Sequence, residues 1–189
     1  PAGLLAAGSA AQNGAKVLIL EKMYAPGRKL LITGKGRCNV TNEATISEFI
    51  THIFPDGRFL RSAFAGFFSK DIIDLLAEQG VACTLERGGR WFPESNQSAD
   101  ILKALLKWVG ELGVEIVCNQ RVEKLLVENG AIQGVKANGE NYPASSVILA
   151  TGGKSYPGTG STGDGYELAR QVGHTIEKPI PALVPLETK

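Results

Sequence analysis

The amino-acid sequence predicts an α/β fold, with a parallel sheet, flanking helices and a three-stranded β-meander that forms a crossover. Three stretches support this prediction. Residues 1–22, PAGLLAAGSAAQNGAKVLILEK, contain a turn, a helix of small residues and a short apolar strand that ends at an acid. Asn-Gly pairs at 129–130 and 138–139 separate three short strands, as is typical of hairpins. The apolar run 147–150 is followed by Thr-Gly-Gly, so a second buried strand leads into a glycine-rich loop.

The N-terminal stretch has the order of the second half of a nucleotide-binding βαβ unit. In the full unit a strand leads into G-x-G-x-x-G, a helix follows, and the next strand ends in Asp or Glu about 20 residues on. Gly3 can be only the last glycine of that motif, so we expect the first strand to be missing. The helix start suits a pyrophosphate, because free N–H groups and the helix dipole attract negative charge. Glu21 can accept hydrogen bonds from ribose hydroxyls.

The alternative is an ordinary alanine-rich helix and strand with a surface acid. Under the nucleotide hypothesis, residues 17–20 form a parallel strand buried on both faces. Small side chains would then let the first helix lie close against the sheet. These small residues are Gly3, Ala6, Ala7, Gly8, Ala10 and Ala11.

The composition is that of a globular protein, with 43% hydrophobic and 21% charged residues among 189. A net charge of +1 gives no expectation of nucleic-acid or membrane-surface binding. No apolar run is long enough to span a bilayer. Cys38, Cys83 and Cys118 are widely spaced, which disfavours a disulfide framework and a zinc site. We therefore expect a cytoplasmic protein that binds no metal.

The segment 25–42, APGRKLLITGKGRCNVTN, has no clear helical or strand periodicity. Long loops in compact domains are usually functional. The glycines permit close backbone approach, the cations attract a phosphate or an anionic ring, and the amides and hydroxyls can form hydrogen bonds. The alternative is a solvated basic loop. The residues expected to contact a ligand here are Arg28, Lys29, Gly34, Gly36, Arg37, Cys38, Asn39, Thr41 and Asn42.

This loop resembles the hallmark of the BaiN/YhiN-like family of NAD(P)/FAD-dependent oxidoreductases. Pro1-Ala2-Gly3 and Glu21-Lys22 also match the family pattern, and Thr33 stands where the family more often has Ser. The resemblance covers the whole chain but only about the first half of a family member. It implies a Rossmann-like FAD-binding domain over residues 1–189. We expect this domain to be incomplete, lacking its first strand, an inserted second domain and a C-terminal FAD-binding segment.

Between the loop and the meander, the sequence predicts three helices, an apolar helical face over residues 59–68 and a hairpin. Thr45 and Glu48 form a capping box, whereas Ser69 and Ser98 are expected to cap the next two helices. Trp91 and Phe92, in the hairpin, are expected to pack in the core, although the resemblance places this hairpin over the substrate side. The predicted helices are 46–53, 70–79 and 99–112, and the hairpin strands are 83–86 and 90–92.

The C-terminal part is predicted to contain strands at 114–117, 122–128, 132–137, 140–142 and 147–150, and a helix at 164–172. The resemblance implies that Val122 contacts adenine through its backbone. It also implies that Thr151, Gly152 and Gly153 close the FAD-binding half. Asp164 either contacts the ribityl or flavin group or caps its helix. The tail PIPALVPLE is expected to be extended.

The resemblance implies hydride transfer from NAD(P)H through FAD to an unsaturated organic acceptor, a small molecule. The catalytic side chains are unknown, and we expect residues 1–189 alone to be inactive. Two alternatives are a tRNA-modification-type flavoprotein and a non-catalytic flavin-binding sensor. The residues expected to bind FAD are Pro1, Ala2, Gly3, Glu21, Lys22, Arg28, Lys29, Gly34, Gly36, Arg37, Cys38, Asn39, Thr41, Asn42, Val122, Thr151, Gly152, Gly153 and Asp164.

Overall fold

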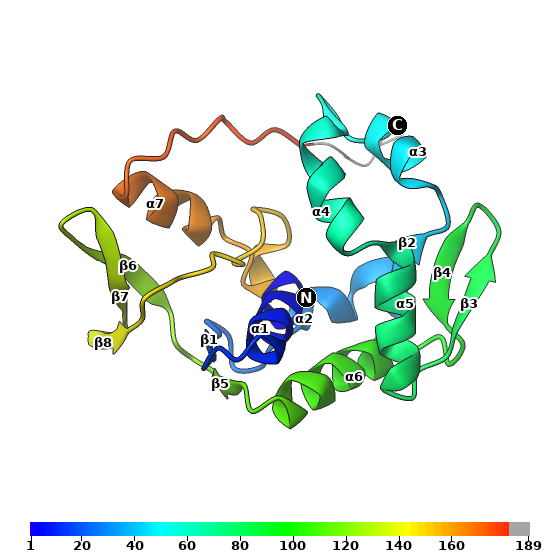
Figure 1. Ribbon diagram of the computed structural model, residues 1–189, viewed down its shortest axis with the longest axis horizontal. Coiled ribbons are helices and arrows are strands. Elements are labelled where there is room, and N and C mark those ends of the chain that lie inside the picture. Colours follow the sequence, from blue (N-terminus) through cyan, green and yellow to red (C-terminus); the bar gives the residue numbers. More distant parts are fainter. Residues whose placement is uncertain (182–189) are drawn as a thin grey trace, which may run out of the picture. The chain divides into compact units, whose positions relative to one another are not determined.

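The computed structural model describes residues 1–181, and the expected tail falls largely outside them. The chain divides into two compact units (Figure 1). Unit 1 comprises Pro1–Ile19 and Ala25–Val117, and unit 2 comprises Leu20–Tyr24 and Cys118–Lys189. Each unit has its own apolar core. That residues 1–189 form one incomplete domain stays a prediction.

Unit 1 is built mainly of helices. Helix α1 (Ala2–Gln12) packs against α6 (Ser98–Glu111), because Gly8 leaves room for the ring of Trp108. A Cβ atom at Gly8 would lie 2.1 Å from Cη2 of that ring. Gly8 therefore serves a helix–helix contact that was not expected from the sequence. The remaining helical segments are α2 (Arg28–Leu31), η1 (Thr33–Gly36), α3 (Ile46–Thr51), η2 (Gly57–Leu60), α4 (Arg61–Gly66) and α5 (Ser69–Glu78).

The parallel sheet consists of β1 (Leu18–Leu20) and β5 (Glu115–Val117), which are neighbours. The Glu115 amide donates to the Val17 carbonyl at 3.2 Å. The prediction that this strand is buried on both faces was wrong, since Leu18 is 40% exposed. Within residues 1–181, β5 is its one hydrogen-bonded neighbour, so the strand lies at an edge and is incompletely covered.

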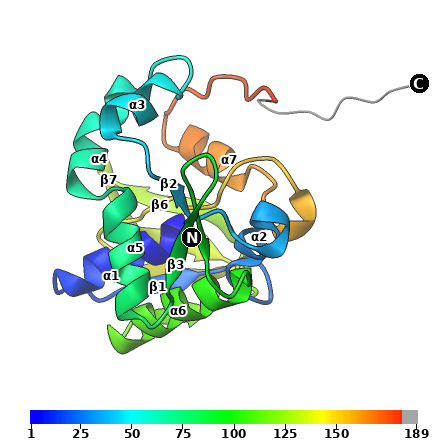
Figure 2. The same ribbon diagram turned by 90° about the vertical axis from the view of Figure 1, so that its right-hand side faces the viewer.

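A second sheet in unit 1 has the order β2-β4-β3 and joins the glycine-rich loop to the hairpin (Figure 2). Its strands are β2 (Thr41–Asn42), β3 (Cys83–Glu86) and β4 (Arg90–Pro93). Pairing is antiparallel, with Thr41 opposite Trp91 and Thr84 opposite Phe92. Phe92 is buried, as expected of a core residue.

One predicted cap is present and two are not. Thr45 and Glu48 form the capping box of α3. Ser69 and Ser98 lie inside their helices, and the residues before them, Phe68 and Gln97, take the cap positions. The two serine hydroxyls bond instead to other segments: Ser69 to the Thr41 hydroxyl at 2.8 Å, and Ser98 to the Leu31 carbonyl at 2.9 Å. Tertiary hydrogen bonds outweigh the local preference at both positions.

Unit 2 contains the predicted meander and a helix. Strands β6 (Val122–Glu128), β7 (Ala131–Ala137) and β8 (Glu140–Pro143) form an antiparallel sheet in that order. Helix α7 (Asp164–Gln171) packs on it through Leu168, which is buried with Leu125 and Val135. A short helical turn, η3 (Pro157–Thr159), precedes it.

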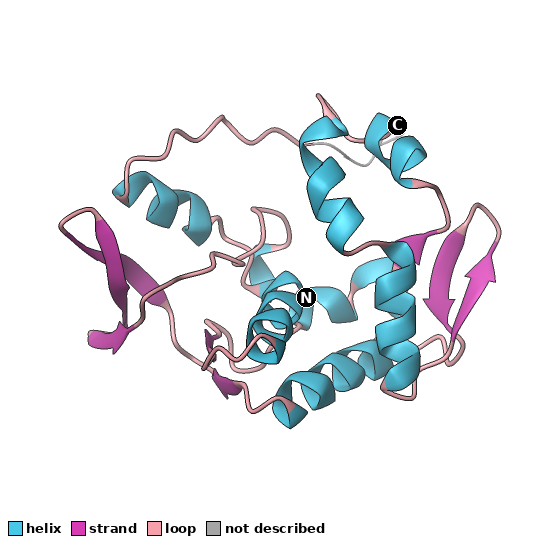
Figure 3. Cartoon of the chain, viewed as in Figure 1, coloured by secondary structure: helices cyan, strands magenta, loops and turns pink. Residues whose placement is uncertain are grey.

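The predicted strand at 147–150 is absent from the structure, and Figure 3 draws this segment as a loop. Ile148 is 66% exposed. A strand needs a hydrogen-bonded neighbour, and within residues 1–181 none pairs with this segment. Val147 and Leu149 instead line an apolar groove of about 390 Å³ between the meander and the residues after α7. Across the part of the chain described, no helix has the length and apolar character needed to cross a membrane.

Candidate functional site

The residues expected to bind a cofactor lie in both units. In unit 1, Pro1 takes the cap position of α1, and no side chain caps this helix. Its first turn contains no acidic residue. The first N–H groups of a helix have no intrahelical partner, so this end offers donors and a positive dipole end to an anion. Ala2 and Gly3 belong to this first turn, as expected.

The glycine-rich loop folds into a tight turn with left-handed backbone. The amide of Arg37 donates to the Gly34 carbonyl at 3.2 Å, and that of Cys38 to the Thr33 carbonyl at 3.0 Å. The φ angles are +54° at Gly34, +58° at Lys35, +85° at Gly36 and +63° at Cys38. For Lys35 and Cys38 this conformation costs about 1 kcal/mol or more each, so other contacts must hold the turn.

The polar residues at the end of the loop contact the protein. Asn42 accepts from the Ala44 amide at 2.9 Å and donates to the Gly88 carbonyl at 3.0 Å. The Thr41 hydroxyl bonds to Ser69, as described above. Both side chains therefore fasten the loop to neighbouring elements. Asn39 is exposed, and its side chain makes no hydrogen bond within residues 1–181.

Arg37 contacts the hairpin and the turn after it through three groups. Its Nε donates to Oδ1 of Asn96 at 2.6 Å, its Nη2 pairs with Oε1 of Glu86, and its Cζ lies 4.1 Å from the centre of the Phe92 ring. Its charge is thus partnered by an acid of the hairpin. Arg28 and Lys29 lie in α2, one turn before the left-handed segment.

The two cysteines near the loop are neutral thiols. Burial raises the pKa of Cys38 above its ordinary value, although a hydrogen bond with Thr33 works in the opposite direction. Burial, with smaller contributions from Cys38 and Glu94, raises the pKa of Cys83 to about 11. Since the thiolate is the reactive form, neither residue is prepared for thiol chemistry at neutral pH.

In unit 2, Glu21 follows β1 and is oriented by the backbone. Its Oε1 accepts from the Met23 amide at 2.8 Å, and its carbonyl accepts from the Gln120 amide at 2.8 Å. Oε2 takes no hydrogen bond from any residue in the described range 1–181. A carboxylate held by one oxygen, with the other available, suits a diol such as the ribose 2′,3′-hydroxyls.

Lys22 and Asp164, two predicted site residues distant in sequence, form an ion pair. Lys22 Nζ lies 2.9 Å from Oδ2 of Asp164 and 2.6 Å from the Thr162 hydroxyl. Thr162 in turn donates to Oδ1 of Asp164 at 2.9 Å, and Arg121 Nε lies 3.4 Å from Oδ2. Partial burial would raise the pKa of Asp164, but the hydrogen bonds from Lys22 and Thr162 and the charges of Lys22 and Arg121 outweigh it and lower that pKa.

This arrangement contradicts the cap interpretation of Asp164, whereas its contact with the ribityl or flavin group stays a prediction. Gly163 takes the cap position of α7, and Asp164 is its first residue. The Asp164 carboxylate bonds to side chains, so it is not a helix cap. It fixes the strand end at Lys22 to the start of α7 within unit 2.

The second glycine-rich stretch is close to the same helix. A Cβ atom at Gly165 would lie 2.3 Å from Oγ1 of Thr151, so the helix can approach only because this residue has no side chain. Gly152 has φ of +74°, whereas Gly153 does not have a positive φ. Val122 begins β6 opposite Ala137.

The sequence did not reveal four residues that hold predicted site residues in place. Arg121 and Thr162 contact Asp164, and Glu86 and Asn96 contact Arg37. Thr162 lies in the same glycine-rich stretch as Asp164, which was a usable signal. Pairing of Glu86 with Arg37 has no signal in the sequence, because the fold brings these residues together. One surface groove is lined by some of the residues between Gln79 and Lys107, and another by some of those between Leu125 and Ile176. No predicted site residue lines either groove.

Three comparisons relate the chain to known proteins. A family model described as the HI0933-like protein Rossmann domain matches residues 1–182. The chain is 40% identical to the 3-dehydro-bile acid delta(4,6)-reductase of Clostridium scindens, over 99% of this chain and 45% of that protein. It is 31% identical to the ribosomal RNA dihydrouridine synthase of Haemophilus influenzae, over 97% of this chain and 46% of that protein.

The chain thus spans less than half the length of these two relatives. Among solved structures, THI4 of Thermovibrio ammonificans matches 73% of this chain and 44% of its own, with a TM-score of 0.50 and 17% identity. At that identity the likeness concerns the fold alone.

Proposed function

The chain belongs to the HI0933-like family of Rossmann-domain proteins, and from this premise we propose that it is the FAD-binding part of a flavin-dependent oxidoreductase. The family match over residues 1–182 is the observation that carries the proposal. When bound, the flavin would accept a hydride from NAD(P)H and pass reducing equivalents to an unsaturated organic acceptor.

The residues of this chain fit such a cofactor by the chemistry of their donors and acceptors. The uncapped start of α1 supplies N–H groups to a pyrophosphate. Glu21 has one carboxylate oxygen available for ribose hydroxyls, and the left-handed turn at Gly34–Gly36 allows close backbone approach. Lys22 and Asp164 neutralise each other and hold the glycine-rich stretch after Thr151 in place. We assign to these groups the binding and orientation of the cofactor.

The small-molecule acceptor is favoured by the higher identity to the bile acid reductase. That relative's name describes reduction at double bonds of a ring system, which is the chemistry expected from the resemblance. The net charge of +1 gives no indication of a polyanionic acceptor. We also propose that the protein acts in the cytoplasm, without a membrane or nucleic-acid partner.

A second candidate is modification of RNA, because the other relative is a ribosomal RNA dihydrouridine synthase. Its name also describes the saturation of a double bond, so the two candidates differ in acceptor and not in reaction type. Binding of structured RNA usually requires a basic surface, and the near-neutral charge of this chain disfavours it.

The two candidates are separated by one experiment on the full-length protein that carries this sequence. Oxidation of NADH and NADPH is followed by absorbance with either an unsaturated 3-oxo steroid or unmodified ribosomal RNA as acceptor. The proposal expects turnover with the steroid and none with the RNA. Turnover with RNA alone would favour the second candidate, and failure with every acceptor would favour a non-catalytic flavin sensor.

A further inference from the structure

The guanidinium of Arg37 is held from three directions by one hairpin and the turn after it. Asn96 accepts from its Nε, Glu86 pairs with its Nη2, and the ring of Phe92 lies beneath its plane. The side chains of Arg37 and Glu86 are 35% and 32% exposed, so water only partly screens the pair. A planar cation with one stacking and two directional contacts has little freedom to turn toward another anion.

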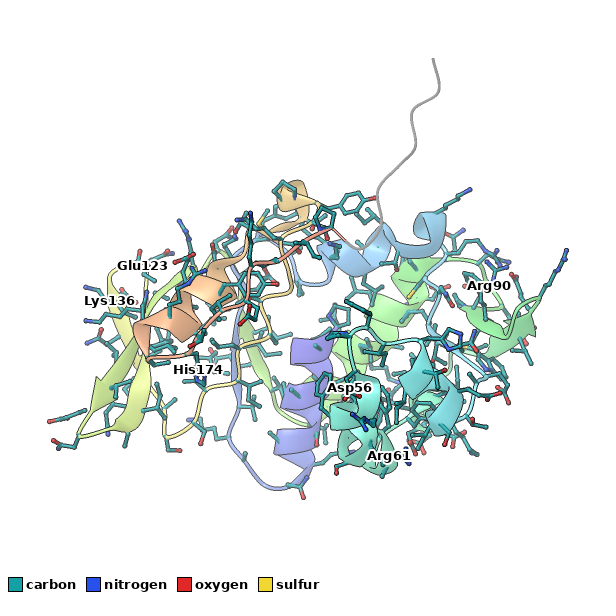
Figure 4. The ribbon with its side chains drawn as sticks, turned by 90° about the horizontal axis from the view of Figure 1, so that it is seen from above. Asp56, Arg61, Arg90, Glu123, Lys136 and His174 are labelled. Atoms are coloured by element: carbon teal, nitrogen blue, oxygen red, sulfur yellow. The ribbon has the colours of Figure 1, made fainter. Side chains whose placement is uncertain are left out.

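Glu86 has another cation within reach and does not pair with it. Arg90 is opposite Glu86 in the register of β3 and β4. Arg90, labelled in Figure 4, donates from Nε to the Arg87 carbonyl at 3.1 Å, and its Cζ lies 5.6 Å from the centre of the Phe92 ring. The carboxylate of Glu86 is therefore directed at the loop and not across the hairpin.

The loop needs such an anchor. Lys35 and Cys38 adopt left-handed backbone that is unfavourable for residues with side chains, and they flank Arg37 closely in sequence. A Cβ atom at Gly34 would lie 2.8 Å from the amide nitrogen of Asn39 and 3.3 Å from Cε1 of Phe92. The turn and the hairpin are thus in direct contact, and Arg37 provides the charged link between them.

We propose that Glu86 and Asn96 are positioning residues, which hold Arg37 against Phe92 and thereby fix the Gly34–Cys38 turn in the conformation that receives the anionic cofactor. This inference rests on the proposed function. It gives Arg37 a structural task that differs from the contact with a phosphate or an anionic ring expected from the sequence, because its charge is already partnered. Without the pairing to Arg37, the negative charge of Glu86 would be unfavourable beside a loop that binds an anion.

The two roles of Arg37 make opposite predictions for a reversed ion pair. If Arg37 contacts a phosphate, placing an acid there is harmful whatever residue stands at position 86. If Arg37 is the link to the hairpin, the double variant R37E/E86R restores the link with the charges exchanged. The side-chain amide of Asn96 carries both a donor and an acceptor, so it can bond to a cation or to an anion at position 37.

The test uses the full-length protein and two readouts. Amide hydrogen exchange of the peptide covering residues 33–39 is measured without FAD, and FAD affinity is measured by titration with flavin fluorescence. We expect E86Q and R37Q each to speed exchange and to weaken FAD binding by about tenfold, as for loss of a hydrogen bond to a charged group. R37E/E86R should return FAD affinity to within about threefold of the wild type. R90Q, which alters the neighbouring cation over the same ring, should change neither readout.

Unchanged loop exchange in E86Q, or a reversed pair that binds FAD no better than R37E, would overturn the proposal. The urea midpoint of each variant verifies folding, and N96A serves as a second variant where E86Q does not fold. If the wild-type protein does not bind FAD, the proposed function fails, while the exchange measurements still decide whether Glu86 holds the loop.

Discussion

Gly8 of α1 lies directly over the indole of Trp108 in α6, so close that a Cβ atom there would be 2.1 Å from the ring. The two helices form the centre of the unit 1 core, with Leu4, Ala7, Leu105 and Val109 buried around the contact. This helix is the one whose first turn is expected to face the pyrophosphate. The position of that turn therefore depends on the contact between α1 and α6, which a substitution at Gly8 can disrupt.

Gly8→Ala should destabilise the protein, because the added methyl group must displace a buried tryptophan. Overpacking of this kind costs about 1–3 kcal/mol. The measurement is the free energy of unfolding in urea. Gly110→Ala is the matched control on α6: a Cβ atom there meets nothing within 4 Å, so it should stabilise the helix by about 0.5–1 kcal/mol. Equal effects of the two substitutions would contradict this packing.

The Lys22–Asp164 pair should make stability depend on pH in the acid range. The pKa of Asp164 is lowered in the folded protein. Its contribution to stability is therefore fully present above the unfolded pKa, near pH 4, and is lost as the pH falls through the folded pKa. Asp164→Asn should be less stable than the wild type at about pH 6, and the difference should shrink below about pH 3. Asp74→Asn, in an exposed pair with Lys70, is the control and should show little effect.

Two glycines of the loop should differ in their tolerance of a methyl group. Both have positive φ, but a Cβ atom at Gly34 would lie 2.8 Å from the Asn39 amide, whereas one at Gly36 meets nothing within 4 Å. Gly34→Ala should therefore reduce the flavin content of the purified protein, with helix content unchanged by circular dichroism. Gly36→Ala should cost only the backbone strain of about 1 kcal/mol. The same loss of flavin in both variants would mean that contact with Asn39 is not the cause.

Glu21→Ala should weaken FAD binding by about 1–3 kcal/mol, the range for loss of a hydrogen-bonding partner of a buried group. Titration with flavin fluorescence measures this change. Glu128→Ala, at the exposed end of β6, is a control that removes an equal charge away from the predicted site residues. A Glu21→Ala protein with unchanged FAD affinity would remove this residue from the site.

The fold was predictable where the signals are local. Asn-Gly pairs located the meander, and the Thr45–Glu48 pattern located a helix start. The resemblance to the BaiN/YhiN-like family is confirmed by the family match. The fold class is confirmed as well.

The errors came from partners that are distant in sequence. Ser69 and Ser98 have the chemistry of helix caps, yet their hydroxyls bond to Thr41 and Leu31. Residues 147–150 have the composition of a strand, but composition cannot supply the neighbour that a strand needs. The side-chain partners of Arg37 were hidden for the same reason. The set of FAD-binding residues stays a prediction.

The absorption spectrum of the purified full-length protein shows whether it is a flavoprotein. We expect a yellow protein with the bands of a bound oxidised flavin, and release of FAD, identified by its mass, when the protein is denatured. A colourless protein that does not bind FAD on titration, or one that releases FMN, would contradict this expectation.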